Sequence, residues 1–167
     1  MAATNGLRRV AWAGLLPLLL GCTSVDPGPD FVIPETVFDA NYFYCHVEPG
    51  LMFAYNCGPG DPSMGDPNNG CHYNPAAVSG MILVNKTPVD CGGGDVPLDP
   101  GTVAVGSPPQ QDYGSVSLEM SSDFTTSALW TRPSDASGCP PPAHPRCVFS
   151  QTGNPDVEML LSTWATK

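Results

Sequence analysis

Residues 42–57 read YFYCHVEPGLMFAYNC, and this stretch decides how the rest of the chain is interpreted. Its apolar residues recur every four positions, at Phe43, Val47 and Leu51. That spacing is typical of one apolar helix face, and the helical signal runs on into Cys57. Pro49 and Gly50 interrupt the pattern, so we expect either a kink or two shorter helices.

A loop of turn-forming residues follows this helical stretch. Residues 58–70 read GPGDPSMGDPNNG, in which only Ser63 and Met64 are not Gly, Pro, Asp or Asn. Such a composition favours tight turns. The loop leads directly into Cys71 and His72, so a spacer that folds outward would leave Cys57 close to this Cys-His pair.

The clearest helix lies at the C-terminus. Asn154 can cap it and Pro155 suits its first turn. One apolar face follows, made of Val157, Leu160, Leu161 and Trp164. We expect this face to pack into the core, and we expect the apolar run 81–84 to be a strand or a core segment. The sequence therefore predicts a small, loop-rich domain that is mainly α.

Composition excludes several functions. The chain has 167 residues, which suggests about one domain, and its formal net charge is −10. An acidic chain has no basic patch to neutralise phosphates, so we expect no nucleic-acid partner. Neither the Gly-x-Ser-x-Gly motif nor the His-Glu-x-x-His motif of hydrolases occurs. We expect a protein that is not an enzyme.

The N-terminus has the pattern of an export signal. Two arginines precede an apolar run at residues 11–20, AWAGLLPLLL, which is too short to span a bilayer as a helix. The run ends in Leu-Leu-Gly-Cys at residues 19–22, which resembles the bacterial lipobox. The resemblance implies a signal peptide over 1–21, lipidation at Cys22, a lipid-anchored linker over 22–34 and a domain over 35–167. The membrane would be the outer membrane of the cell envelope, with the protein facing the periplasm or the cell surface.

The six other cysteines suit an oxidising compartment, and sequence alone does not choose among their 15 possible pairings. Covalent haem attachment needs two thiols for the vinyl groups and a histidine beside the second thiol to bind iron. The usual motif is Cys-x-x-Cys-His. Here Cys57 precedes Cys71-His72 with 13 residues between, so the motif is expanded.

Other parts of the chain carry the same resemblance. Residues 42–57 resemble the helix that leads into the haem motif of small cytochrome c-like domains in bacterial envelope lipoproteins. Later segments resemble that family in the same order: VSGMIL at 78–83, GSP at 106–108, SALWTR at 127–132, His144-Pro145 and the closing helix at 157–164. The resemblance covers roughly residues 40–165 and departs from the family at its strongest motif.

The resemblance implies a cytochrome c-like domain that carries haem c and transfers electrons to a redox protein partner. Cys57 and Cys71 would hold the haem, and His72 would bind its iron. The sixth ligand would be His144, with Met120 as the second candidate. Two further pairs would then be disulfides, Cys45 with Cys91 and Cys139 with Cys147.

An alternative from a different class explains the same cysteines without a cofactor. If Cys57 and Cys71 simply pair, they close the 13-residue spacer as a stapled loop. The chain would then be a disulfide-stabilised structural or interaction lipoprotein of the same fold. The residues alone favour neither interpretation.

Overall fold

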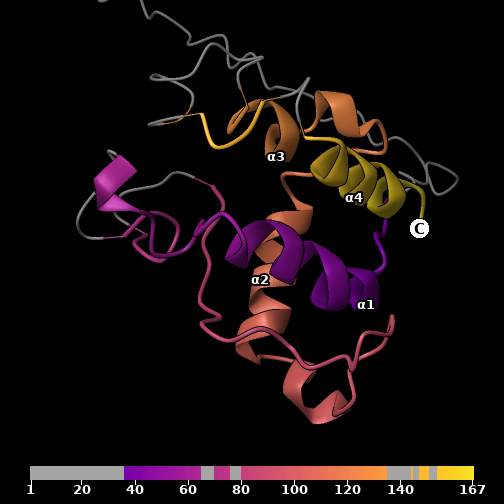
Figure 1. The fold of residues 1–167 in the computed structure, drawn as a ribbon. Coiled ribbons are helices and arrows are strands. Elements are labelled where there is room, and N and C mark those ends of the chain that lie inside the picture. The colour runs from indigo at the N-terminus through magenta and orange to yellow at the C-terminus, as the bar shows by residue number, and fades with distance from the viewer. Residues whose placement is uncertain (1–35, 65–69, 76–79, 135–143, 145–146, 151–153) are drawn as a thin grey trace, which may run out of the picture. The chain divides into compact units, whose positions relative to one another are not determined.

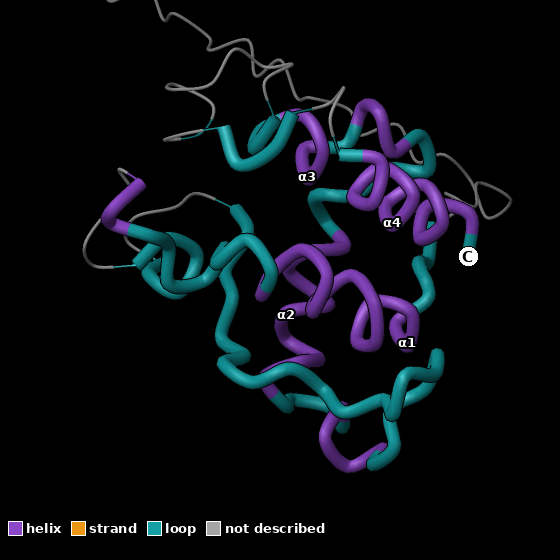
Figure 2. The backbone as a smooth tube through the Cα atoms, viewed as in Figure 1, coloured by secondary structure: helices purple, strands orange, loops and turns teal. Residues whose placement is uncertain are grey.

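Short helices joined by long loops make up the described part of the chain (Figures 1 and 2). The computed structural model describes residues 36–64, 70–75, 80–134, 144, 147–150 and 154–167. All of these belong to one unit of the chain, which extends over residues 35–167. Its helices are α1 (Ala40–Tyr42), η1 (Phe43–Phe53), η2 (Pro62–Met64), η3 (Pro100–Val103), α2 (Pro108–Ser117), η4 (Phe124–Thr126), α3 (Ala128–Thr131) and α4 (Pro155–Thr166).

The prediction of a mainly helical fold is confirmed. Within the described residues there is no strand, and one isolated parallel bridge joins Ser134 to Phe149. None of the helices in those residues is long and apolar enough to cross a membrane.

The first long helix is wound as a π-helix. Asp39 caps α1 by accepting a hydrogen bond from the Tyr42 amide at 2.9 Å, and η1 continues from α1 without a break. The wide winding continues past its end, where the Ala54 amide donates to the Pro49 carbonyl at 3.2 Å. Of the two expectations for Pro49, the division into two shorter helices is wrong, because η1 runs through this residue as one helix. A π-turn is wider than an α-turn, which relieves the clash between a proline ring and the carbonyl four residues before it.

The core forms where η1 meets α4, as the periodicity of both segments predicts (Figure 1). Phe43 is fully buried, and its ring centre lies 5.5 Å from that of Trp164. The Trp164 indole donates a hydrogen bond to the Asp39 carbonyl at 2.9 Å. Other buried residues of the two helices are Val47, Leu51, Val157 and Leu161. The start of α1 is therefore anchored on the last helix.

Asn154 occupies the predicted N-cap of α4, but its side chain does not cap the helix. Its carbonyl oxygen accepts from the Tyr55 hydroxyl at 3.4 Å, and its amide donates to the Ser150 carbonyl at 3.2 Å. Asn154 thus links α4 to the turn that follows η1 and to the segment before the helix.

The apolar run 81–84 is a core segment rather than a strand. Met81 and Leu83 are buried, while Ile82 and Val84, which alternate with them along the chain, are exposed. Side chains of α2 hold its backbone in place of a partner strand. The Ile82 amide donates to the Ser115 hydroxyl at 2.7 Å, and the Val84 amide donates to the carboxylate of Asp112 at 2.7 Å.

Two buried carboxyl groups connect this segment to the helices. Asp112 is 1% exposed, and Glu48 of η1 is 0% exposed. The Asn85 side-chain amide donates to Glu48 Oε1 at 2.8 Å, whereas Glu48 Oε2 has no hydrogen-bond partner among the described residues. Burial raises the pKa of Glu48 to about 7 and that of Asp112 to about 6. Each acid therefore takes up a proton more readily in the folded state than in the unfolded chain.

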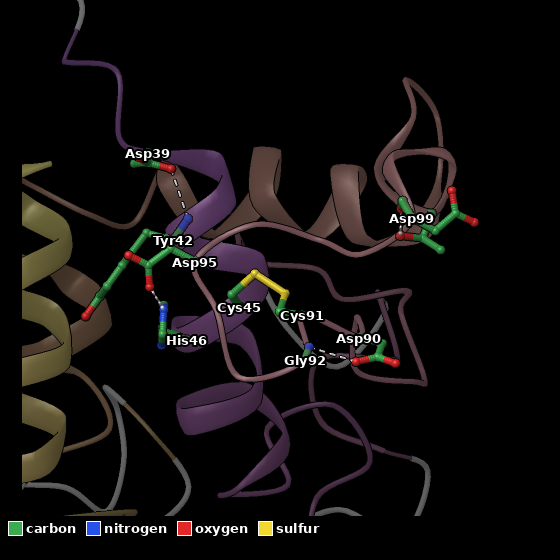
Figure 3. The surroundings of a disulfide bond; sticks show 10 residues. Asp39, Tyr42, Cys45, His46, Asp90, Cys91, Gly92, Asp95 and Asp99 are labelled. Carbon is green, nitrogen blue, oxygen red and sulfur yellow. Dashed lines mark hydrogen bonds and ion pairs between the residues drawn. A yellow bond between two sulfur atoms is a disulfide. The ribbon is translucent and has the colours of Figure 1, made fainter.

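A disulfide joins η1 to the loop that follows this segment (Figure 3). Cys45 and Cys91 form it, which is the pairing that the resemblance implies. Beside it, His46 Nε2 and a carboxylate oxygen of Asp95 lie 2.7 Å apart. The disulfide closes 46 residues of chain, for which loop entropy gives a stabilisation of about 4 kcal/mol.

We predict that the free energy of unfolding falls as the pH rises from 5 to 8. A group whose folded pKa is raised stabilises the protein below its ordinary pKa and loses that contribution as the pH rises through the folded value. For Glu48 the loss is roughly 3 kcal/mol. Glu48→Gln cannot ionise, so we expect urea unfolding to show a flatter pH dependence in this variant.

The matched control is Glu158→Gln, which changes an exposed carboxyl in the first turn of α4. It should leave the pH dependence between 5 and 8 unchanged. An equal slope in the wild type and Glu48→Gln would show that the buried carboxyl is not the titrating group.

Candidate functional site

The two ends of the 13-residue spacer are joined by backbone hydrogen bonds. The His72 amide donates to the Cys57 carbonyl at 3.1 Å. The Gly58 carbonyl accepts from the amides of Cys71 and Tyr73, at 3.1 Å and 3.0 Å. The expectation that the spacer leaves Cys57 beside the Cys-His pair is confirmed. These bonds bring together groups that are far apart in the sequence.

Both cysteines line one small cavity of about 20 Å³. Its lining consists of Tyr55, Asn56, Cys57, Cys71, His72, His144 and Val148. Cys57 and Cys71 hold thiols rather than a disulfide, and the Cys57 sulfur lies 3.6 Å from the Leu51 carbonyl oxygen. The third disulfide of the cofactor-free alternative is thus not formed.

The orientation of His72 is set by the core segment. Its Nδ1 lies 2.8 Å from the Met81 carbonyl oxygen. A carbonyl only accepts, so Nδ1 carries the proton and Nε2 keeps its lone pair for another partner. Burial lowers the pKa of His72, and the nearby His144 lowers it further, although the bond to Met81 acts in the opposite direction. The ring is therefore held in the neutral form that binds metals.

A second imidazole faces the first across the cavity. The ring centres of His72 and His144 lie 6.4 Å apart, and the ring planes differ by 24°. Two imidazole nitrogens that bind one metal ion from opposite sides each lie roughly 2 Å from it, which places the ring centres about 6 Å apart. The observed separation of the ring centres is close to that value.

The side-chain types at the cavity suit haem c, but its volume does not. Two thiols and two imidazoles line one cavity, which are the side-chain types that covalent attachment and two axial ligands require. The cavity holds only about 20 Å³, room for about one water molecule and far below the range of about 300–1,000 Å³ for pockets that hold drug-sized ligands, so a porphyrin enters only if these residues move apart. Among the described residues, no group of three or more His, Cys, Asp or Glu side chains is arranged to hold a metal ion.

The other predicted site residues lie elsewhere. Met120 lies in the hydrophobic core, 9% exposed, and is not among the residues that line the cavity. Cys147 is disulfide-bonded, and its predicted partner Cys139 lies outside the described residues. Cys22, with the whole of the predicted signal peptide and linker, also lies outside them.

The sequence did not predict the contact between Gly58 and Tyr73, which lies at the base of the spacer. A Cβ atom placed on Gly58 would lie 2.3 Å from Cζ of the Tyr73 ring, so this ring rests against the glycine backbone. Gly58 is one of many glycines in a loop built of turn formers, and nothing local marks it as a packing position. The one signal that could have indicated this contact is the position of Tyr73 directly after Cys71-His72.

Comparison with protein-family models, with curated proteins and with solved structures finds no match for this chain.

We predict that Gly58→Ala lowers the free energy of unfolding by about 1–3 kcal/mol, because the new methyl group overpacks the site and pushes the Tyr73 ring aside. Gly114→Ala is the matched control, because its Cβ would meet nothing within 4 Å on the exposed face of α2. That change should raise the free energy by about 0.5–1 kcal/mol. Denaturant unfolding measures both, and equal effects would contradict the close packing at Gly58.

Proposed function

We propose that this chain is a cytochrome c-like electron-transfer protein that holds haem c through Cys57 and Cys71. The observation that carries the proposal is the meeting of two thiols and two near-parallel imidazoles at one cavity. The spacer that separates the two cysteines in the sequence is closed at its base, so its length does not oppose the proposal.

Each residue of the cavity has a distinct role in this proposal. Cys57 and Cys71 would hold the haem through thioether bonds, and His72 and His144 would be the ligands of its iron. The haem would supply one-electron redox chemistry. Met81 orients His72 through the bond to Nδ1, which leaves Nε2 as the ring nitrogen that would bind the metal. Two histidine ligands favour a lower reduction potential than a histidine and a methionine.

The surroundings of the site support electron transfer with a protein partner. The formal net charge of −10 favours a basic redox partner, whose association would weaken with added salt. The Cys45–Cys91 disulfide is compatible with an oxidising compartment. With the lipobox at Cys22, we place the protein in the cell envelope, anchored to the outer membrane by lipid.

The cofactor-free alternative has less support. It uses a Cys57–Cys71 disulfide to staple the spacer, whereas both residues hold thiols and the backbone bonds alone close the loop. It also gives no reason for two imidazoles to face each other across the same cavity. A structural or interaction role for the chain remains the outcome if haem is not bound.

We predict that the number of thioether bonds to haem equals the number of cysteines present at positions 57 and 71, when the protein is made in a periplasm with haem maturation machinery. Cys57→Ser and Cys71→Ser each leave one thioether bond in place of two, and the double variant releases its haem on acid extraction. His144→Met keeps the attachment and raises the midpoint potential, because thioether ligation favours the reduced iron. Pyridine haemochrome spectra and redox titration measure these changes.

The control for this series removes the disulfide instead. Cys45→Ser combined with Cys91→Ser should lower stability by about 4 kcal/mol and leave the haem attachment unchanged. Full covalent haem retention in the Cys57, Cys71 double variant would rule out the proposed attachment sites.

A further inference from the structure

The ring of Tyr73 lies against the backbone that carries the first thiol. A Cβ on Gly58 would meet three atoms of this ring, at 2.3, 2.4 and 2.7 Å. The Tyr73 amide also donates to the Gly58 carbonyl at 3.0 Å. Backbone and side chain of one residue therefore hold Gly58, which is bonded to Cys57, against the segment that contains Cys71 and His72.

The far end of the ring is anchored to the core. The Tyr73 hydroxyl donates to the Asn85 carbonyl at 2.5 Å, and the Asn85 side-chain amide donates to Glu48 at 2.8 Å. Glu48 is fully buried in η1, the helix that runs into Cys57, whose amide bonds the Met52 carbonyl at 2.9 Å. Tyr73, Asn85 and Glu48 thus link the segment that contains Cys71 to the helix that leads into Cys57.

We infer that Tyr73 is a positioning residue that sets the spacing between the Cys57 and Cys71 thiols. Tyr73 is not part of the cavity lining, so it acts through the two cysteines rather than on a bound group. The use of that spacing for haem rests on the proposed function, whereas the spacing itself does not. Fixing both thiols in advance lowers the entropy lost when one molecule bonds to both.

Tyr113 provides a control of matched chemistry. Its hydroxyl donates to the Phe38 carbonyl at 2.5 Å, and its ring is half-buried like that of Tyr73. Tyr113 packs against Phe43 and Tyr44 in the core. Tyr113→Phe therefore removes an equivalent hydrogen bond and leaves the contacts of Tyr73 with Gly58 and Asn85 in place.

The test uses the full chain made without haem and phenylarsine oxide, which bonds two neighbouring thiols through one arsenic atom and releases water. Cys57→Ser gives the background from other thiols. We expect Tyr73→Phe to weaken binding roughly fivefold through the lost hydrogen bond, and Tyr73→Ala to weaken it by at least about tenfold. Tyr113→Phe should lower stability as much as Tyr73→Phe and leave the affinity for the arsenical unchanged.

Three results would overturn the inference. The first is wild-type affinity in both Tyr73 variants. The second is a wild type that binds no more arsenical than Cys57→Ser. The third is an equal loss in Tyr73→Phe and Tyr113→Phe, which would make the effect one of general stability. Because no haem is present, a failure to incorporate haem would contradict the proposed function and leave this comparison intact.

Discussion

The base of the spacer is the constraint on which the site depends. Three backbone hydrogen bonds join Cys57 and Gly58 to residues 71–73. Closing a flexible loop costs entropy that grows only slowly with its length, so a spacer of 13 residues is tolerated where its ends are well bonded. Gly58 makes this closure possible because its missing side chain admits the ring of Tyr73.

Buried polar groups connect that closure to the rest of the fold. Glu48 in η1, Asn85 directly after the core segment and Asp112 in α2 join three parts of the chain through hydrogen bonds. Burying two carboxyl groups opposes folding near neutral pH, because each must be desolvated or protonated. The core segment gains a fixed register from them, and that register places the Met81 carbonyl beside His72.

Local patterns predicted much of this structure. Apolar periodicity predicted the buried faces of η1 and α4, and the turn-forming residues of the spacer allowed Cys57 to lie near His72, as the backbone hydrogen bonds show. The π-winding through Pro49 could not be predicted, since it balances a local clash against packing of the whole helix. The same holds for the bond between Asn85 and Glu48, which lie 37 residues apart, because contacts of that range leave no periodic signal.

The most direct test of the account is the haem content of the full-length protein, made in a periplasm with haem maturation machinery. After acidified acetone extraction and gel filtration in denaturant, a pyridine haemochrome spectrum measures the haem that remains bonded to the chain. The account predicts one haem per chain, with the spectrum of two thioether bonds. A colourless protein in which mass spectrometry finds Cys57 and Cys71 joined in a disulfide would contradict it.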